Sequence, residues 1–174
     1  VQIADLEGDG LLDVAVSGKT GFSVFWNDGP SGLSAEDHVA VGADLSWIHT
    51  HDLDGDGADE LVHTLCSDSG ERLRVYSFPG RTPQVEFKLN PGSGQPHSPD
   101  LGDVNGDGIL DLAVPTISKD VHIFYGQGGT QFSTTADQIL TTGASAHGIE
   151  LIDYDKDGDC DLLVAAHDND RVHL

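Results

Sequence analysis

One nine-residue pattern of acidic residues and glycine occurs four times in this chain of 174 residues, and it constrains the fold more than any other feature. Each copy has an oxygen-bearing side chain at positions 1, 3, 5 and 9 and a glycine at position 6. The copies, called here the first to fourth acidic loops, are residues 5–13, 52–60, 103–111 and 153–161. A chain organised in this way is a repeat protein.

Calcium binding explains this spacing. Calcium takes six to eight oxygen ligands, and alternate side chains of a tightly curled segment can all point at one centre. Glycine at position 6 permits the positive φ of the sharp turn. A helix-loop-helix calcium hand also needs a bidentate Glu at position 12. The four loops instead have, at that position, Val16, His63, Val114 and Val164. The loops are therefore predicted to bind up to four calcium ions, one each, without flanking helices.

The predicted ligands are the oxygen-bearing side chains together with the backbone carbonyl of position 7. In the first two loops they are Asp5, Glu7, Asp9, Leu11, Asp13, Asp52, Asp54, Asp56, Ala58 and Glu60. In the last two they are Asp103, Asn105, Asp107, Ile109, Asp111, Asp153, Asp155, Asp157, Asp159 and Asp161. Carboxylates gathered in this way repel one another without an ion, so we expect a structural metal. Asn105 lowers the charge of the third loop, which is expected to bind calcium most weakly.

The loops recur at a period of about fifty residues, because their first aspartates are 47, 51 and 50 residues apart. That period is typical of propeller blades. Short apolar segments flank each loop, and a turn then leads to a third segment and a weaker fourth. No segment has a helical pattern. We predict an all-β fold, a β-propeller of four-stranded antiparallel blades, with repeat units at residues 1–45, 46–96, 97–146 and 147–174.

Each repeat offers candidate strands at matching places. Strand one is read at residues 1–4 and 148–152, and strand two at 13–17, 61–66, 112–117 and 162–166. Strand three is read at 22–26, 73–78, 121–125 and 171–174, and strand four at 38–41, 85–89 and 138–141. Apolar residues fall on both faces of strands two and three, as expected when each sheet packs against neighbours on both sides.

The segments that follow the loops resemble a known family. Residues 12–16 (LDVAV), 60–63 (ELVH), 110–114 (LDLAV) and 160–164 (CDLLV) are similar to FG-GAP/VCBS repeats, the calcium-binding blades of integrin-α-like propellers, as are 25–29 (FWNDG) and 124–126 (FYG). The resemblance spans essentially the whole chain. It implies a ring of seven or eight blades, of which about three and a half are present here. The remaining blades are expected from missing chain or from self-association.

The end of each blade far from its acidic loop is expected to lie around the propeller mouth, where the resemblance places ligand sites. His97 and His147 lie six residues before their loops, His167 lies six residues after the fourth, and Trp47 lies near the same rim. One interpretation is that these rings only pack or cap strand ends. The other is that they form a polar site for a sugar, a transition metal or acid–base chemistry.

Two further pairs of residues have expected positions. Trp26 and Tyr125 occupy equivalent places on third strands, so we expect them to pack in the core. His49 and His63 lie three residues before and three after the second loop, so we expect them to be cross-strand neighbours.

The charge balance excludes some classes of partner. The chain has 8 Lys and Arg against 30 Asp and Glu, with a net charge of −22, whereas nucleic acid binding needs basic residues. No apolar run approaches the ~18 residues of a membrane span. Exposed calcium loops suit millimolar extracellular calcium, and the resembled repeats are common in bacterial secreted and surface proteins. We therefore expect an extracellular, secreted or cell-surface protein.

Three functions remain open from the sequence. The leading hypothesis is a calcium-stabilised binding module that recognises a carbohydrate or a protein through the histidine-rich mouth, with Trp47, His97, His147 and His167 as ligand-binding candidates. The alternative is a propeller-type polysaccharide lyase or sugar dehydratase, in which His147, His167 or His97 would be the base. The third is a purely structural scaffold.

Overall fold

The computed structural model describes residues 1–34, 37–40, 46–65, 73–89, 94–166 and 171–173. These residues form four antiparallel sheets, and each sheet follows the chain order of its strands. The first contains β1 (Gln2–Ala4), β2 (Asp13–Ser17), β3 (Gly21–Phe25) and β4 (Asp37–Ala40). The second contains β5 (Ser46–His51), β6 (Glu60–Leu65), β7 (Leu73–Ser77) and β8 (Gln84–Leu89).

The third sheet contains β9 (Asp100–Gly102), β10 (Asp111–Pro115), β11 (Asp120–Phe124) and β12 (Gln138–Thr141). The fourth contains β13 (Ala146–Ile152), β14 (Asp161–Ala166) and β15 (Arg171–His173). The helical elements of the described residues are two single 3₁₀ turns, η1 (Gly29–Ser31) and η2 (Pro79–Arg81). Every predicted strand is found, with its described ends within two residues of the predicted ones, whereas the predicted ends at residues 41, 66 and 174 lie outside the described residues. No helix in these described ranges is long and apolar enough to cross a membrane.

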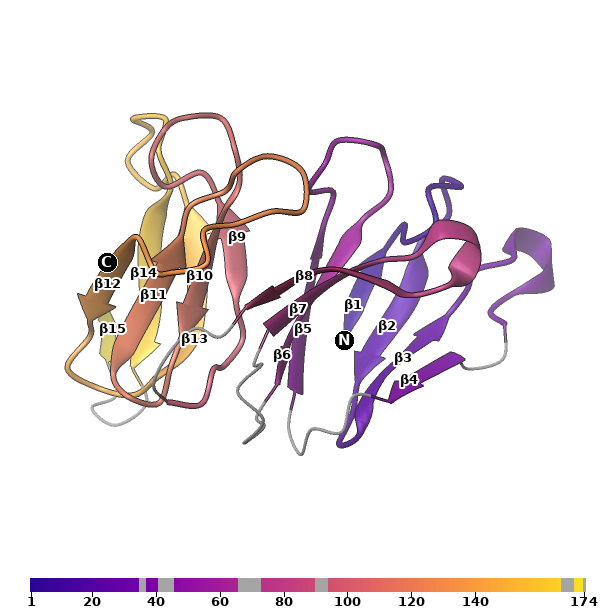
Figure 1. Ribbon diagram of the computed structural model, residues 1–174, viewed down its shortest axis with the longest axis horizontal. Helices are drawn as coiled ribbons and strands as arrows, with labels where there is room; N and C mark the ends of the chain where they lie inside the picture. Colours follow the sequence, from indigo (N-terminus) through magenta and orange to yellow (C-terminus); the bar gives the residue numbers. More distant parts are fainter. Residues whose placement is uncertain (35–36, 41–45, 66–72, 90–93, 167–170, 174) are drawn as a thin grey trace.

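The sheets stand side by side with their first strands toward one another. β1 contacts β5, and β9 contacts β13 (Figure 1). The side-chain amide of Gln2 on β1 donates a hydrogen bond of 3.1 Å to the carbonyl of Ile48 on β5. The turns between first and second strands, which are the acidic loops, lie along one edge of the molecule, at the top of Figure 1. This is the blade arrangement that the repeat predicted.

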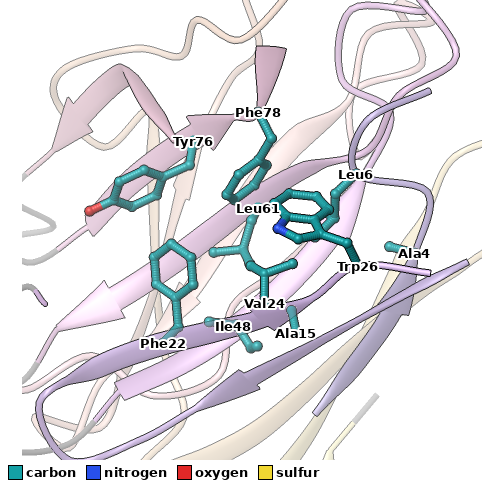
Figure 2. Close-up of a cluster of buried hydrophobic side chains, with 10 residues drawn as sticks. All are labelled: Ala4, Leu6, Ala15, Phe22, Val24, Trp26, Ile48, Leu61, Tyr76 and Phe78. Carbon is teal, nitrogen blue, oxygen red and sulfur yellow. The ribbon is translucent and has the colours of Figure 1, made fainter. Parts of the chain in front are cut away.

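Successive sheets are held together by apolar side chains between them. One cluster of ten buried residues joins the first two sheets (Figure 2). Phe22 on β3 meets Tyr76 on β7 edge to face, with ring centroids 5.1 Å apart. Trp26 is buried in this cluster, and its indole N–H donates to Asp37 at 2.7 Å. Tyr125 is partly buried against a second such cluster. Both aromatic residues pack as predicted.

The expected pairing of His49 with His63 is wrong by one residue. His63 lies opposite Ile48, and His49 lies opposite Val62, because the hairpin pairs His51 with Glu60. A slip of one residue turns a side chain to the other face of a sheet. His63 is accordingly buried against Phe22, with ring centroids 5.2 Å apart.

Candidate calcium loops and a row of aromatic rings

The aspartate at position 1 organises each of the first three acidic loops. In the first loop, one carboxylate oxygen of Asp5 accepts from the backbone N–H of Gly8 at 2.8 Å and the other from Gly10 at 2.7 Å. Asp103 makes the equivalent bonds in the third loop. Asp52 does so in the second, with Gly55 and Gly57. The glycine at position 6 has a positive φ in all four loops, between 82° and 107°. The predicted reason for glycine at this position is confirmed.

Carboxylates converge in the second and fourth loops. Oxygen atoms of Asp52, Asp54 and Asp56 lie within 4.8 Å of one another. The same holds for Asp153, Asp155 and Asp161. Oxygen ligands at about 2.3–2.6 Å from a common calcium ion are separated by such distances. The donor sets of these two loops therefore fit calcium.

Repulsion within the fourth loop supports the same conclusion. Asp157 raises the pKa of the Asp155 carboxyl, and Asp161 and Asp153 add to this effect. A cation at the centre of the loop would relieve this repulsion. In the third loop, partial burial acts to raise the pKa of the Asp103 carboxyl. The hydrogen bonds that it accepts from backbone N–H groups outweigh this effect, so the pKa is lowered.

The acids at position 9, which we call struts, have a second role, since they accept hydrogen bonds from backbone N–H groups inside the sheet. Asp13, Glu60 and Asp111 are buried. Asp111 accepts from the backbone N–H of Val104 at 3.0 Å and of Gly126 at 2.9 Å. Each strut thereby ties its acidic loop to the body of its sheet. Burial raises the pKa of Glu60 to about 7, and repulsion from Asp54, Asp56 and Asp52 adds to the rise.

The residues at position 7 turn their N–H groups toward the carboxylate at position 5. Leu11 donates to Asp9 at 2.8 Å, and Ala58 donates to Asp56 at 2.8 Å. Ile109 and Asp159 repeat this bond, to Asp107 and Asp157. Ligation through the carbonyls of position 7, and through Asn105 in the third loop, stays a prediction. In the first loop, the Glu7 carboxylate is instead paired with Arg81 of the turn η2.

Neighbouring acidic loops are bonded to each other. The N–H of Asp59 donates to the carbonyl of Asp5 at 2.7 Å, and the Asp59 carboxylate accepts from the N–H of Asp5. The N–H of Cys160 donates to the carbonyl of Asp103 at 2.8 Å, at the equivalent place between the third and fourth loops. An ion that rigidifies one loop would thus also act on the next sheet.

Three aromatic side chains from successive repeats form a row at the other end of the blades. The rings of Trp47 and His97 have centroids 4.6 Å apart, and those of His97 and His147 are 4.2 Å apart. We call these three residues the ring row. His97 is buried between its neighbours, Trp47 is partly exposed and His147 is exposed. The structure brings these three predicted site residues together, whereas His167 lies outside the described residues.

Local backbone features hold the ring row in place. Thr64, opposite Trp47 in the sheet, donates its hydroxyl to the carbonyl of His97 at 3.1 Å. The N–H of His97 donates to the carbonyl of Pro115 at 2.9 Å. His147 falls at a shift of register between Ala146 and Gly148 in the β13–β14 pairing. Burial, together with the proximity of His147, lowers the pKa of His97.

The sequence reasoning missed a histidine–carboxylate pair on the innermost strands. His49 Nε2 lies 3.2 Å from Asp100 Oδ1, and the other oxygen of Asp100 accepts from the N–H of Leu151 at 2.7 Å. Burial lowers the pKa of His49, although Asp100 opposes that change. Gln2, His49, Asp100 and Glu150 all lie three residues before their loops. Comparing polar residues at this repeat position could have found the pair.

Comparison with known protein families identifies the same repeats. A model of FG-GAP-like repeats matches residues 5–63, 52–114 and 103–164. The chain belongs to the FG-GAP-like repeat family. Comparison with curated proteins gives no match.

Solved structures share the fold of this FG-GAP-like chain. One is a lectin from Agrocybe aegerita, described as specifically recognising non-reducing terminal N-acetylglucosamine. Its TM-score is 0.65 at 22% identity, over 93% of this chain and 45% of the lectin. Another is BBS1N in complex with ARL6DN, with a TM-score of 0.66 at 14% identity, over 99% of this chain and 55% of that chain. The FG-GAP-like chain thus spans about half the length of these propeller proteins, and its fold is that of a partial β-propeller.

Proposed function

We propose that this FG-GAP-like chain is part of a calcium-stabilised propeller that binds carbohydrate at the end opposite its acidic loops. The observation that carries the proposal is the ring row, in which Trp47, His97 and His147 from three successive repeats lie ring against ring. Three side chains thus converge from separate repeats, with the partly exposed Trp47 and the exposed His147 on either side of the buried His97.

The chemistry of the ring row suits a sugar. A pyranose ring packs its C–H face on an aromatic surface such as that of Trp47, and its hydroxyl groups exchange hydrogen bonds with imidazole nitrogens. The excess of acids, 30 against 8 basic residues, disfavours sulfated or uronate glycans and favours neutral or amino sugars. The lectin that shares the fold recognises an N-acetylated sugar, which supports this ligand class.

Calcium has the structural role in this proposal. The carboxylates that converge in the second and fourth loops would hold the ion, and the hydrogen bonds between neighbouring loops would pass the resulting rigidity from sheet to sheet. Exposed loops of this kind are suited to the millimolar calcium outside cells. We therefore extend the proposal to an extracellular or cell-surface location.

Calorimetric titration of the full chain with N-acetylglucosamine oligosaccharides, after a glycan array has ranked ligands, tests the proposal. Trp47→Ala is expected to weaken binding about tenfold or more, because an aromatic anchor is lost. His147→Ala is expected to weaken binding less. Tyr154→Ala is the matched control, since Tyr154 is an exposed aromatic residue in the fourth acidic loop.

Two results would overturn the carbohydrate proposal. One is the absence of glycan binding by the intact chain when a protein is captured instead through the same residues. The other is an equal affinity of wild type and Trp47→Ala. If uronate substrates gave unsaturated products that absorb in the ultraviolet, and His147→Ala abolished them, a lyase activity would replace binding.

A further inference from the structure

Arg81, in the turn η2 of the second repeat, reaches across to the first acidic loop. Its guanidinium makes a bidentate ion pair with Glu7, with Nε 2.8 Å from Oε2 and Nη2 2.6 Å from Oε1. The remaining nitrogen, Nη1, lies 2.8 Å from Asp28. The guanidinium carbon also lies 5.5 Å from the centroid of the Trp26 ring. All three partners belong to the first repeat, so Arg81 bridges two successive repeats.

The backbone at Arg81 is held in an unfavourable conformation. Gly80 and Arg81 both lie in the left-handed region, with φ of 58° and 63°. This region is uncommon for residues other than glycine, and a residue stays in it only where contacts with its surroundings offset the strain. Here those contacts are the ion pairs with Glu7 and Asp28 and the contact with Trp26. The guanidinium is thus held by three side chains of the first repeat.

Glu7 occupies position 3 of the first acidic loop, where the second and fourth loops have Asp54 and Asp155. Those two aspartates belong to the groups of three convergent carboxylates. Both oxygens of Glu7 are instead bound by Arg81. Within the described ranges, no comparable group of three carboxylates is found in the first loop.

We propose that Arg81 controls calcium binding at the first acidic loop by holding Glu7 away from the ion. This inference rests on the proposed calcium role of the loops. Calcium and the guanidinium compete for one carboxylate, so the first loop fills only at calcium concentrations that release Glu7. Linkage is reciprocal. Calcium at this loop therefore weakens the Arg81 bridge between the first and second repeats.

Calcium titration of the full chain by calorimetry tests this inference. Arg81→Gln frees Glu7, and one site is expected to bind calcium on the order of tenfold more tightly. Asp5→Ala removes the position-1 ligand of the first loop. The gain in calcium affinity must therefore disappear in the double variant Asp5→Ala, Arg81→Gln. Arg81→Lys keeps the charge but not the bidentate fork, and it is expected to give a smaller gain.

Lys19→Gln is the matched control, because it removes one positive charge from an exposed turn between β2 and β3. Circular dichroism of each variant verifies the fold. If the loops bind calcium but Arg81→Gln leaves every affinity unchanged, the inference is wrong and the calcium proposal stands. It is also wrong if the gain survives Asp5→Ala. A chain that binds no calcium at any loop, with or without Arg81, would overturn both.

Discussion

His63 is a buried side chain whose two ring nitrogens have no hydrogen-bond partner within the described ranges. Phe22 and Tyr76 pack against it, and Arg74 is a charged group nearby. Burial, with a contribution from Arg74, lowers its pKa to about 4. In an unfolded chain a histidine titrates near 6.5. Between these two values the unfolded state binds more protons, so the stability that neutral His63 contributes is lost as the pH falls.

Replacing His63 with Phe should remove this pH dependence. We expect wild type to lose about 2 kcal/mol more unfolding free energy than His63→Phe between pH 7.5 and pH 5. Urea unfolding at the two pH values, in saturating calcium, measures the difference. His38→Gln, at an exposed histidine on β4, is the control. Equal pH slopes for wild type and His63→Phe would contradict the prediction.

At the scale of the blade, the buried acid at position 9 and the exposed carboxylates of the same acidic loop have different roles. Asp111 accepts hydrogen bonds from two backbone N–H groups, and a bound cation cannot take over its role as their acceptor. Asp107, in contrast, lies on the exposed turn. In the presence of a chelator, Asp111→Ala should therefore lower the unfolding free energy by about 2–4 kcal/mol, because those groups lose their acceptor. Asp107→Ala should have little effect in the chelator and should weaken calcium binding. Equal losses for both variants in the chelator would refute this separation.

The repeat explains which parts of the blade could be predicted from the sequence. Four copies of the loop marked the first hairpin of each sheet, so the strands and the glycine turns followed from local patterns. The predicted register of the β5–β6 hairpin was wrong by one residue, because the spacing of the acids does not specify that His51 lies opposite Glu60.

Contacts between blades could not be predicted in the same way. Arg81 and Glu7 are 74 residues apart in sequence, and His49 and Asp100 lie in different repeats. The Arg81–Glu7 pair depends on how two sheets pack sideways, which no local pattern encodes. The His49–Asp100 pair would have required a comparison of polar residues at one position of the repeat. The row of Trp47, His97 and His147 could be predicted because His97 and His147 lie six residues before their loops and Trp47 lies five before its loop, which places all three at the same end of their blades.

At the scale of the whole molecule, calcium has to counter the charge of the acidic edge. The chain carries a net charge of −22, and the acidic loops lie along one side (Figure 1). Without ions this edge repels itself, and the repulsion opposes the packing of neighbouring blades. Sodium chloride is expected to reduce the repulsion in part, through screening. Magnesium is expected to replace calcium poorly, because it demands smaller, octahedral coordination.

Removal of calcium should therefore lower the thermal midpoint. An ion at one hundred times its dissociation constant stabilises the folded state by about 2.7 kcal/mol per site. For a chain of this size that corresponds to roughly 5–10 °C per site. Scanning calorimetry in a chelator and at increasing calcium measures the change. An unchanged midpoint in the chelator would contradict the structural role of calcium.

The calcium dependence of that midpoint should have two stages. The second and fourth loops, with convergent carboxylates, are expected to fill first. The first loop is expected to fill later because Arg81 holds Glu7, and the third because Asn105 contributes no charge. In Arg81→Gln the first loop should move to the early stage while the third stays late. If the third loop filled before the second, the ranking of the loops by carboxylate number would be wrong.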